Sequence, residues 1–288
     1  WGARPSGCAG GAPPGGGAAR GADARGGPPR PPLSDVELQF IQQTLQMWEG
    51  ESAKISTFNA EFQRLEYDMV FGPGESKPLL VRQGTLSYSK PDKGSFKIDK
   101  TTRWTATDPQ NPAAGGTYTE QDEIGEHWVC DGKAVFEYNH RQKQLVVTPI
   151  PEGMRGRAIA DGPLPFLFGA EAQKLMQRYD IRPLQGNPEQ IWLKAYPRYA
   201  NDAANYESVE VILDRKTMHP VALKVYLPGR QQQHVYTFDA PTINGKLDAW
   251  FGGLFSAPRT PFGWTRVVVD DTPSPGPQAA RPGGGVQR

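Results

Sequence analysis

Histidine and cysteine are the first residues to test for chemistry, and this chain has four of the former and two of the latter. No phosphate loop, G-x-S-x-G elbow or H-E-x-x-H pair occurs. His127 and Cys130 form an H-x-x-C motif, but residues three apart on a strand point to opposite faces. They cannot meet at one metal ion or act together as base and nucleophile. We therefore predict no metal site, and a Cys130 that is buried as a small apolar residue.

Carboxylates are the other groups that could catalyse a reaction. They gather at Glu120, Asp122, Glu123 and Glu126, and again at 270–271. Two carboxyl groups about 5–10 Å apart can hydrolyse a glycosidic bond. Acidic clusters in polar loops are usually solvated, however, so we assign no catalytic residue and no cofactor. The chain is predicted not to be an enzyme, with a carboxylate-based hydrolase kept as an alternative.

Apolar side chains in unusual places give a better indication of function. The run DGPLPFLFG at 161–169 is loop-like yet apolar, and its two prolines exclude an ordinary central strand. The strand expected at 191–197 carries large side chains on both faces, which favours burial on both sides. A ligand in a hollow is one candidate for covering such surface. The predicted ligand-binding residues are Leu164, Phe166, Leu167, Phe168, Trp192 and Tyr196.

The elements that must position these residues are one helix and many short strands. Ser34 and Glu37 form a capping box, and Leu38, Ile41, Leu45 and Trp48 then recur on one helical face. Downstream the apolar period changes to two, which is typical of strands with one buried face. A second short helix is expected from Ala170 to about Arg178. The strands are expected near 58–63, 81–89, 94–99, 126–130, 134–139, 144–149, 178–184, 191–197, 207–214, 220–227 and 234–239.

Short links between these runs favour one antiparallel meander. The fold class predicted is mainly β (α+β): a curved antiparallel sheet or half-open barrel of about 10–11 strands. The N-terminal helix and the short helix after the apolar loop should cover it. Residues 106–120 are polar and rich in Gly and Pro, and we expect them to form a long hairpin loop.

Composition divides the chain into three parts. Residues 1–32 hold ten Gly and seven Pro and no Leu, Ile, Val, Phe or Met, and residues 272–288 resemble them. We expect both to be disordered tails around a domain at 33–271. The tails contribute net charges of +3 and +2 to a total of +1, which leaves −4 on the domain. A weakly acidic domain without a basic stripe excludes nucleic acid as the main partner.

The expected location of the protein is outside the cytoplasm. No apolar run approaches the roughly 20 residues of a membrane span, so no transmembrane segment is expected. The chain starts at Trp1, and we interpret it as processed or truncated, with a signal peptide absent from the chain as given. Cys8 lies in the leading tail and has no local partner there. It is interpreted as an unpaired thiol, with lipidation as the alternative.

Several motifs together resemble a known family. They are WVCDG at 128–132, DGPLPFLFG at 161–169, RY at 178–179, AYPR at 195–198, and the closing pair of strands at 220–226 and 234–238. Over about residues 33–247 the chain resembles the LolA-like lipoprotein-carrier fold, and most closely the secreted LolA-like domain family expanded in planctomycetes. That resemblance implies export, a half-closed barrel capped by helices, and binding of lipid or acyl groups.

From these observations we predict a periplasmic or secreted binding protein. It would hold lipoprotein acyl chains or other apolar ligands in the hollow of a half-barrel, with the first helix and the 163–169 loop covering its mouth. An envelope protein is expected as a further partner. The alternative from another class is a non-catalytic structural or interaction module whose core is filled by its own side chains.

Overall fold

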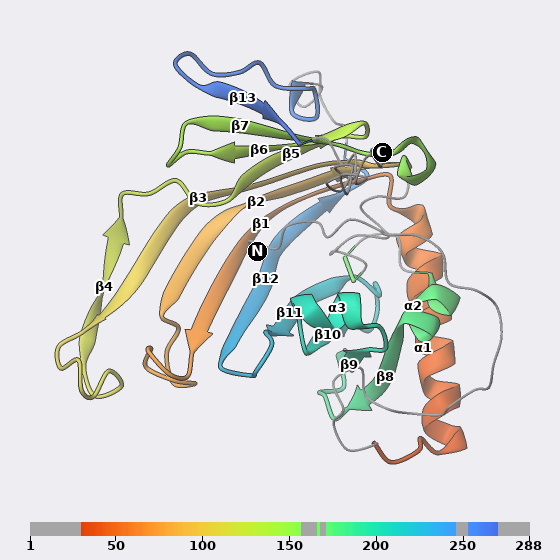
Figure 1. Ribbon diagram of the computed structural model, residues 1–288. Helices are drawn as coiled ribbons and strands as arrows, with labels where there is room; N and C mark the ends of the chain where they lie inside the picture. The colour runs from red at the N-terminus through yellow and green to blue at the C-terminus, as the bar shows by residue number, and fades with distance from the viewer. Residues whose placement is uncertain (1–29, 157–165, 168–170, 246–252, 270–288) are drawn as a thin grey trace, which may run out of the picture.

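The computed structural model describes residues 30–156, 166–167, 171–245 and 253–269 (Figure 1). The predicted tails therefore lie almost wholly outside the described residues, and the domain boundaries stay a prediction. Arg30 is the first residue described, and its guanidinium lies 3.6 Å from the ring centroid of Tyr196 and 3.2 Å from the Asp180 carboxylate.

Helix α1 (Asp35–Lys54) begins where the capping box predicts. The Glu37 backbone N–H donates to Ser34 Oγ at 3.3 Å, and the Ser34 N–H donates to Glu37 Oε2 at 2.8 Å. These two bonds satisfy backbone donors that the first turn of a helix leaves open. Ile41, Leu45 and Trp48 form the buried stripe that the spacing predicts. Leu38, the first residue of the predicted face, is 42% exposed and does not pack.

Thirteen strands of the described residues form one sheet, in the order β13-β7-β6-β5-β3-β2-β1-β12-β11-β10-β9-β8, with β4 paired to β3. Three short helical elements accompany them: η1 (Glu152–Met154), α2 (Ala172–Arg178) and α3 (Ala200–Asn205). The strands are β1 (Thr57–Asp68), β2 (Leu80–Ser89), β3 (Lys93–Ala106), β4 (Gly116–Gln121), β5 (His127–Asp131), β6 (Ala134–Asn139), β7 (Gln144–Pro149), β8 (Tyr179–Leu184), β9 (Gln190–Pro197), β10 (Ser208–Asp214), β11 (Pro220–Tyr226), β12 (Gln232–Ile243) and β13 (Thr265–Val268).

The predicted fold class is confirmed, with two strands more than the sequence indicated. The expected loop at 106–120 is wrong in its second part, because Thr117–Thr119 pair with β3 as strand β4. Alternating Thr and Tyr residues suit a strand even after a Gly- and Pro-rich turn. Strand β13 was not expected, and it pairs parallel with β7.

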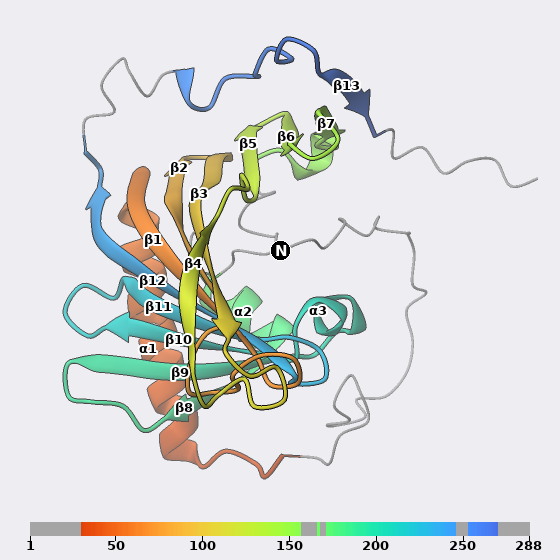
Figure 2. The same cartoon turned by 90° about the vertical axis from the view of Figure 1, so that its left-hand side faces the viewer.

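The sheet is open and curved rather than a closed barrel. It bends from β7 round to β8, and in Figure 2 the bend opens toward α2 and α3. Strands β8 and β13 are its two ends. Strand β1 pairs with β12, so residues from the two ends of the domain meet at the middle of the sheet.

The two faces of the sheet are buried differently. The inner face, on the side of the helices, carries one large core that takes in side chains from α1, α2 and most strands. The outer face carries a small second cluster, made by Ala134, Phe136, Leu145 and Val147. Two residues from the C-terminal segment contact this end of the sheet. The Trp264 ring, just before β13, lies 5.1 Å from the His140 ring, and Arg266 on β13 lies over the Phe136 ring.

Candidate functional site

The inner face of the sheet is the candidate site, because it is apolar over most of its width. Its buried residues run from Cys130 on β5 to Ile181 on β8. Measured between Cα atoms, α1 and α2 come close to β8, and α3 comes close to β9. The side chains of Ile41, Leu45 and Trp48 on α1 belong to the same core as the apolar residues of the sheet.

A row of aromatic rings crosses this face. Trp128 on β5 stacks on Phe96 of β3 at 5.8 Å between centroids, and Phe96 stacks on Phe62 of β1 at 4.7 Å. Phe62 in turn lies 6.4 Å from Tyr236 of β12. Strand β2 lies between β1 and β3, and it contributes Gly84 opposite Phe62. A Cβ at Gly84 would fall 1.9 Å from the Lys97 carbonyl oxygen. With no side chain there, the two phenylalanine rings meet across the strand.

A buried charged side chain lies at the Tyr236 end of the aromatic row. The Arg64 side chain is 2% exposed, and its two terminal nitrogens donate to both oxygens of Glu126 at 3.1 and 3.0 Å. Its Nε lies 2.8 Å from Glu66 Oε1, which also accepts from Arg82 Nε at 2.7 Å. Arg64 further donates to the Tyr236 hydroxyl at 3.4 Å. We call Arg64, Glu66, Arg82, Glu126 and Tyr236 the inner polar cluster.

The electrostatics of this cluster keep its charges in place. Burial alone would lower the pKa of Arg64, but Tyr236, Glu126 and Glu66 raise it above its usual value. Burial is the largest influence on Glu126 and opposes its ionisation, but the charge of Arg64 and the hydrogen bonds from Arg64 contribute to a net lowering of the Glu126 pKa. His234 lies beside the cluster, and burial lowers its pKa to about 4. The imidazole is therefore neutral at pH 7.

Sequence reasoning missed this cluster. Glu126 was interpreted as a solvated loop carboxylate, whereas it pairs with a buried arginine. The available signal was the alternation in β1, where Arg64 and Glu66 continue the buried face of Phe62. A charge on a buried strand face needs a charged partner, and Glu126 immediately precedes β5.

The predicted apolar loop is seen only in part. Phe166 is 4% exposed and Leu167 is 6% exposed, and both belong to the inner core. The Phe166 ring lies 4.9 Å from that of Tyr179. The Tyr179 hydroxyl shares a 2.7 Å hydrogen bond with Tyr206, beside the ion pair of Arg178 with Asp202. Leu164 and Phe168 lie outside the described residues.

Trp192 and Tyr196 lie on the opposite face from Phe166 and Leu167. In β9 the residues Ile191, Leu193 and Ala195 are buried in the inner core, and the alternate residues are half-buried on the outer face. Trp192 Nε1 donates to Gln190 Oε1 at 3.0 Å, and Tyr196 is covered by Arg30. The structure therefore does not bring the predicted ligand-binding residues together in one place, and their role in binding stays a prediction.

The residues tested first for chemistry are also separated. His127 lies on the outer face, while Cys130 is buried in the inner core with its thiol donating to the Asp92 carbonyl at 3.1 Å. Burial raises the pKa of the Cys130 thiol to about 11, which disfavours the reactive thiolate. Within the described ranges, no three His, Cys, Asp or Glu residues are grouped as a metal site.

No protein-family model matches the sequence, and no curated protein matches it. Among solved structures, the chain is similar to an uncharacterized conserved protein of Thermus thermophilus, with 12% identity and a TM-score of 0.42 over 80% of this chain and 100% of that one. It is similar to a putative outer membrane lipoprotein-sorting protein domain of Vibrio parahaemolyticus, with 12% identity and a TM-score of 0.31 over 73% and 96%. A LolA superfamily protein of Nitrosomonas europaea gives 8% identity and a TM-score of 0.33 over 75% and 97%.

These likenesses agree with the predicted LolA-like fold, and they do not bear on the planctomycete family. No helix among the described residues is long and apolar enough to cross a membrane.

Proposed function

We propose that this protein is a non-enzymatic binding protein that holds an apolar chain, such as the acyl chain of a lipid or lipoprotein, against the inner face of its curved sheet. The observation that supports this most directly is the aromatic row from Trp128 to Tyr236. Phe62, Phe96 and Tyr236 are 3–8% exposed without a ligand, so a bound chain would have to replace the groups that cover these rings. Flat rings at adjacent positions form a strip that suits an extended hydrocarbon chain.

The energetics of such binding follow from area. Each methylene group that leaves water contributes about 0.8 kcal/mol, so affinity should rise with chain length and depend little on chain identity. The inner polar cluster at the end of the row would meet the head of a bound amphiphile. Its arginines and carboxylates are already paired, so we expect it to orient the head group rather than to add much affinity.

A periplasmic or secreted location and an envelope protein partner belong to the same proposal. They fit a domain with an acidic net charge and an apolar inner face, together with the low-complexity segments that flank it. No catalytic group is part of the proposal, because Cys130 has a raised thiol pKa and His127 lies on the opposite face of the sheet.

The test compares two tryptophans of equal size on opposite faces. Trp128 and Trp192 are both half-buried, but only Trp128 belongs to the inner aromatic row. We expect Trp128→Ala to weaken binding of a fluorescent fatty acid about tenfold, and Trp192→Ala to leave it within about twofold. The reverse order would favour the outer face and the predicted roles of Trp192 and Tyr196. If neither substitution changes binding of the fatty acid, a site on either face is contradicted.

One observation favours the alternative, a structural module without a ligand. Phe166 and Leu167 fill part of the inner core themselves, as a domain without a ligand would require. Native mass spectrometry of freshly purified protein, with organic extraction, separates the two functions. Co-purifying lipid supports the binding protein. Protein that carries no lipid and also fails to bind the fluorescent probe would favour the structural module whose core is filled by its own side chains.

A further inference from the structure

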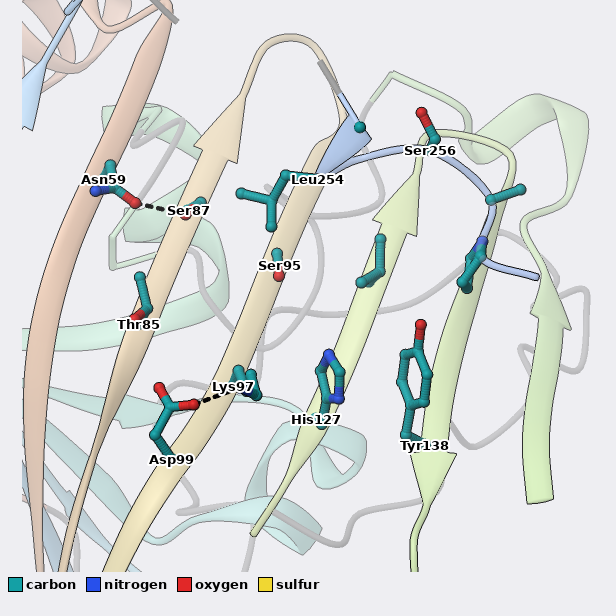
Figure 3. A pocket seen from close by; sticks show the side chains of 14 residues that line it. Asn59, Thr85, Ser87, Ser95, Lys97, Asp99, His127, Tyr138, Leu254 and Ser256 are labelled. Atoms are coloured by element: carbon teal, nitrogen blue, oxygen red, sulfur yellow. Dashed lines mark hydrogen bonds and ion pairs between the residues drawn. The ribbon is translucent and has the colours of Figure 1, made fainter. Parts of the chain in front are cut away.

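A pocket of about 520 Å³ lies on the outer face, away from the site proposed above (Figure 3). Its base is formed by strands β1, β2, β3, β5 and β6, and the segment 253–258 passes over it. The volume is within the range of sites for small molecules, about 300–1,000 Å³. All residues that line it are in the described part of the chain.

One side of the pocket is a row of small polar groups from neighbouring strands. Asn59, Thr85, Ser87 and Ser95 line it, and the Ser87 hydroxyl donates to Asn59 Oδ1 at 2.6 Å. Lys97 and Asp99 complete the row as an ion pair with each other. This side offers hydroxyl and amide groups that both donate and accept hydrogen bonds, and the paired charges add no net charge.

The other side is formed by flat rings. His127 and Tyr138 stack with their centroids 4.0 Å apart and their planes 4° apart, and both line the pocket. His140 continues the stack at 5.8 Å from His127. The roof contributes the apolar side chains of Leu254, Ala257 and Pro258. The pocket therefore has a polar side, formed by strands β1 to β3. Its other side is aromatic and apolar, and is formed by β5, β6 and the segment 253–258.

One buried atom of a pocket-lining side chain lacks a hydrogen-bond partner, although it is not itself accessible from the pocket. Among the described residues, His127 Nδ1 is a buried nitrogen with no hydrogen bond. Burial, together with the positive influence of His140 and Lys97, lowers the pKa of His127 to about 4, so its ring is neutral at pH 7. A neutral imidazole, next to a polar side whose Lys97 and Asp99 charges are paired, favours an uncharged ligand.

We propose that this outer pocket binds a neutral, hydroxyl-rich ring of the size of a sugar. A sugar ring has hydroxyl groups at its rim and C–H groups on its faces, so it matches both sides of the pocket at once. Its hydroxyls would meet the Asn, Thr and Ser row, and its C–H face would lie against the rings or the roof. The inference does not depend on the function proposed for the inner face.

The test uses four methyl glycosides, those of glucose, galactose, mannose and N-acetylglucosamine, with the full chain. We expect saturation-transfer NMR to show binding of at least one of them. Thr85→Trp should fill the pocket and weaken that binding about tenfold or more. The matched control is Thr237→Trp. Thr237 lies on β12, on the same outer face of the sheet as Thr85 but outside the pocket, so this variant should bind within about twofold of the parent chain.

A second variant keeps the test decisive if Thr85→Trp fails to fold. His127→Phe retains a flat ring beside Tyr138 but removes both ring nitrogens, and it should also lower the affinity about tenfold. Absence of binding by all four glycosides would overturn the proposal. So would binding that survives unchanged in folded Thr85→Trp or His127→Phe protein.

Discussion

At the scale of single residues, Arg64 is the side chain whose surroundings are most demanding. It is almost fully buried, and it holds Glu126 through two parallel hydrogen bonds. Removing one member of such a pair leaves the other charge buried without its main partner. We expect Glu126→Gln to lower the free energy of unfolding by about 3 kcal/mol, measured by denaturant titration at pH 7.

A double variant checks the cause of that loss. Arg64→Met combined with Glu126→Gln removes the buried charge together with its partner, while Glu66 keeps Arg82. The double variant should therefore be more stable than the sum of the two single losses predicts, by at least about 1 kcal/mol. Simple additivity would show that the two side chains do not act as a pair.

His234 makes stability depend on pH. Its pKa in the folded chain is about 4, below the ordinary 6.5, because burial disfavours the charged ring. The unfolded chain therefore takes up a proton first as pH falls, so stability is full above 6.5 and declines toward about 4. The loss should be on the order of 3 kcal/mol. His234→Gln should flatten the decline more than His219→Gln does, and an equal effect would contradict this assignment.

Cys130 should react slowly while the protein is folded. With its pKa raised from 9.0 to about 11, the thiolate fraction near pH 8 falls about 100-fold, and burial blocks access as well. In a Cys8→Ala background, labelling by a thiol reagent should become fast only in denaturant. Rapid labelling of the folded chain would contradict this prediction and would favour Cys130 as a reactive nucleophile.

At the scale of elements, the apolar segment around Phe166 decides between a lid and a plug. Phe166 is 4% exposed and packs on Tyr179 inside the core. A charge there should therefore cost about 2–5 kcal/mol of unfolding free energy, as the loss of a large buried side chain does. The matched control is Phe262→Asp, because Phe262 is fully exposed and the change should be nearly neutral.

The companion measurement is binding of the fluorescent fatty acid. Phe166→Asp protein that folds with unchanged stability but no longer binds would show a lid rather than a plug. A large stability loss with binding retained by the folded fraction would show that the segment only fills the core.

At the scale of the whole molecule, sequence patterns predicted most elements but not which surfaces face inward. The capping box placed α1, and period-two alternation located eleven strands. Strand β13 was missed because it pairs in parallel with the distant β7, which no local pattern records. The face of Trp192 and Tyr196 could not be assigned, since β9 has large side chains on both faces and alternation alone does not say which face meets the helices.

The C-terminal segment offers a test of how separable the two faces are. A chain that ends at Gly252 would lack β13 and the roof of the outer pocket, whereas the inner core, as far as the structure describes the chain, uses no residue beyond Ile243. We expect this chain to fold with a lower melting temperature, to keep binding of the fatty acid probe, and to lose binding of the glycosides. Loss of the cooperative unfolding transition would show that the two faces fold as one unit.

The pairing of β1 with β12 has a consequence for how the chain is made. Asp68 and Gln232 are hydrogen-bonded partners 164 residues apart, so β1 can pair with β2 early but lacks its other neighbour, β12, until nearly the whole domain has been synthesised. Until then an apolar strand edge and the unfinished inner face are exposed together, which is the state most prone to aggregation. Pairing over such a separation is also slow. The surface proposed to hold a ligand is thus the surface that a chaperone would have to protect during folding.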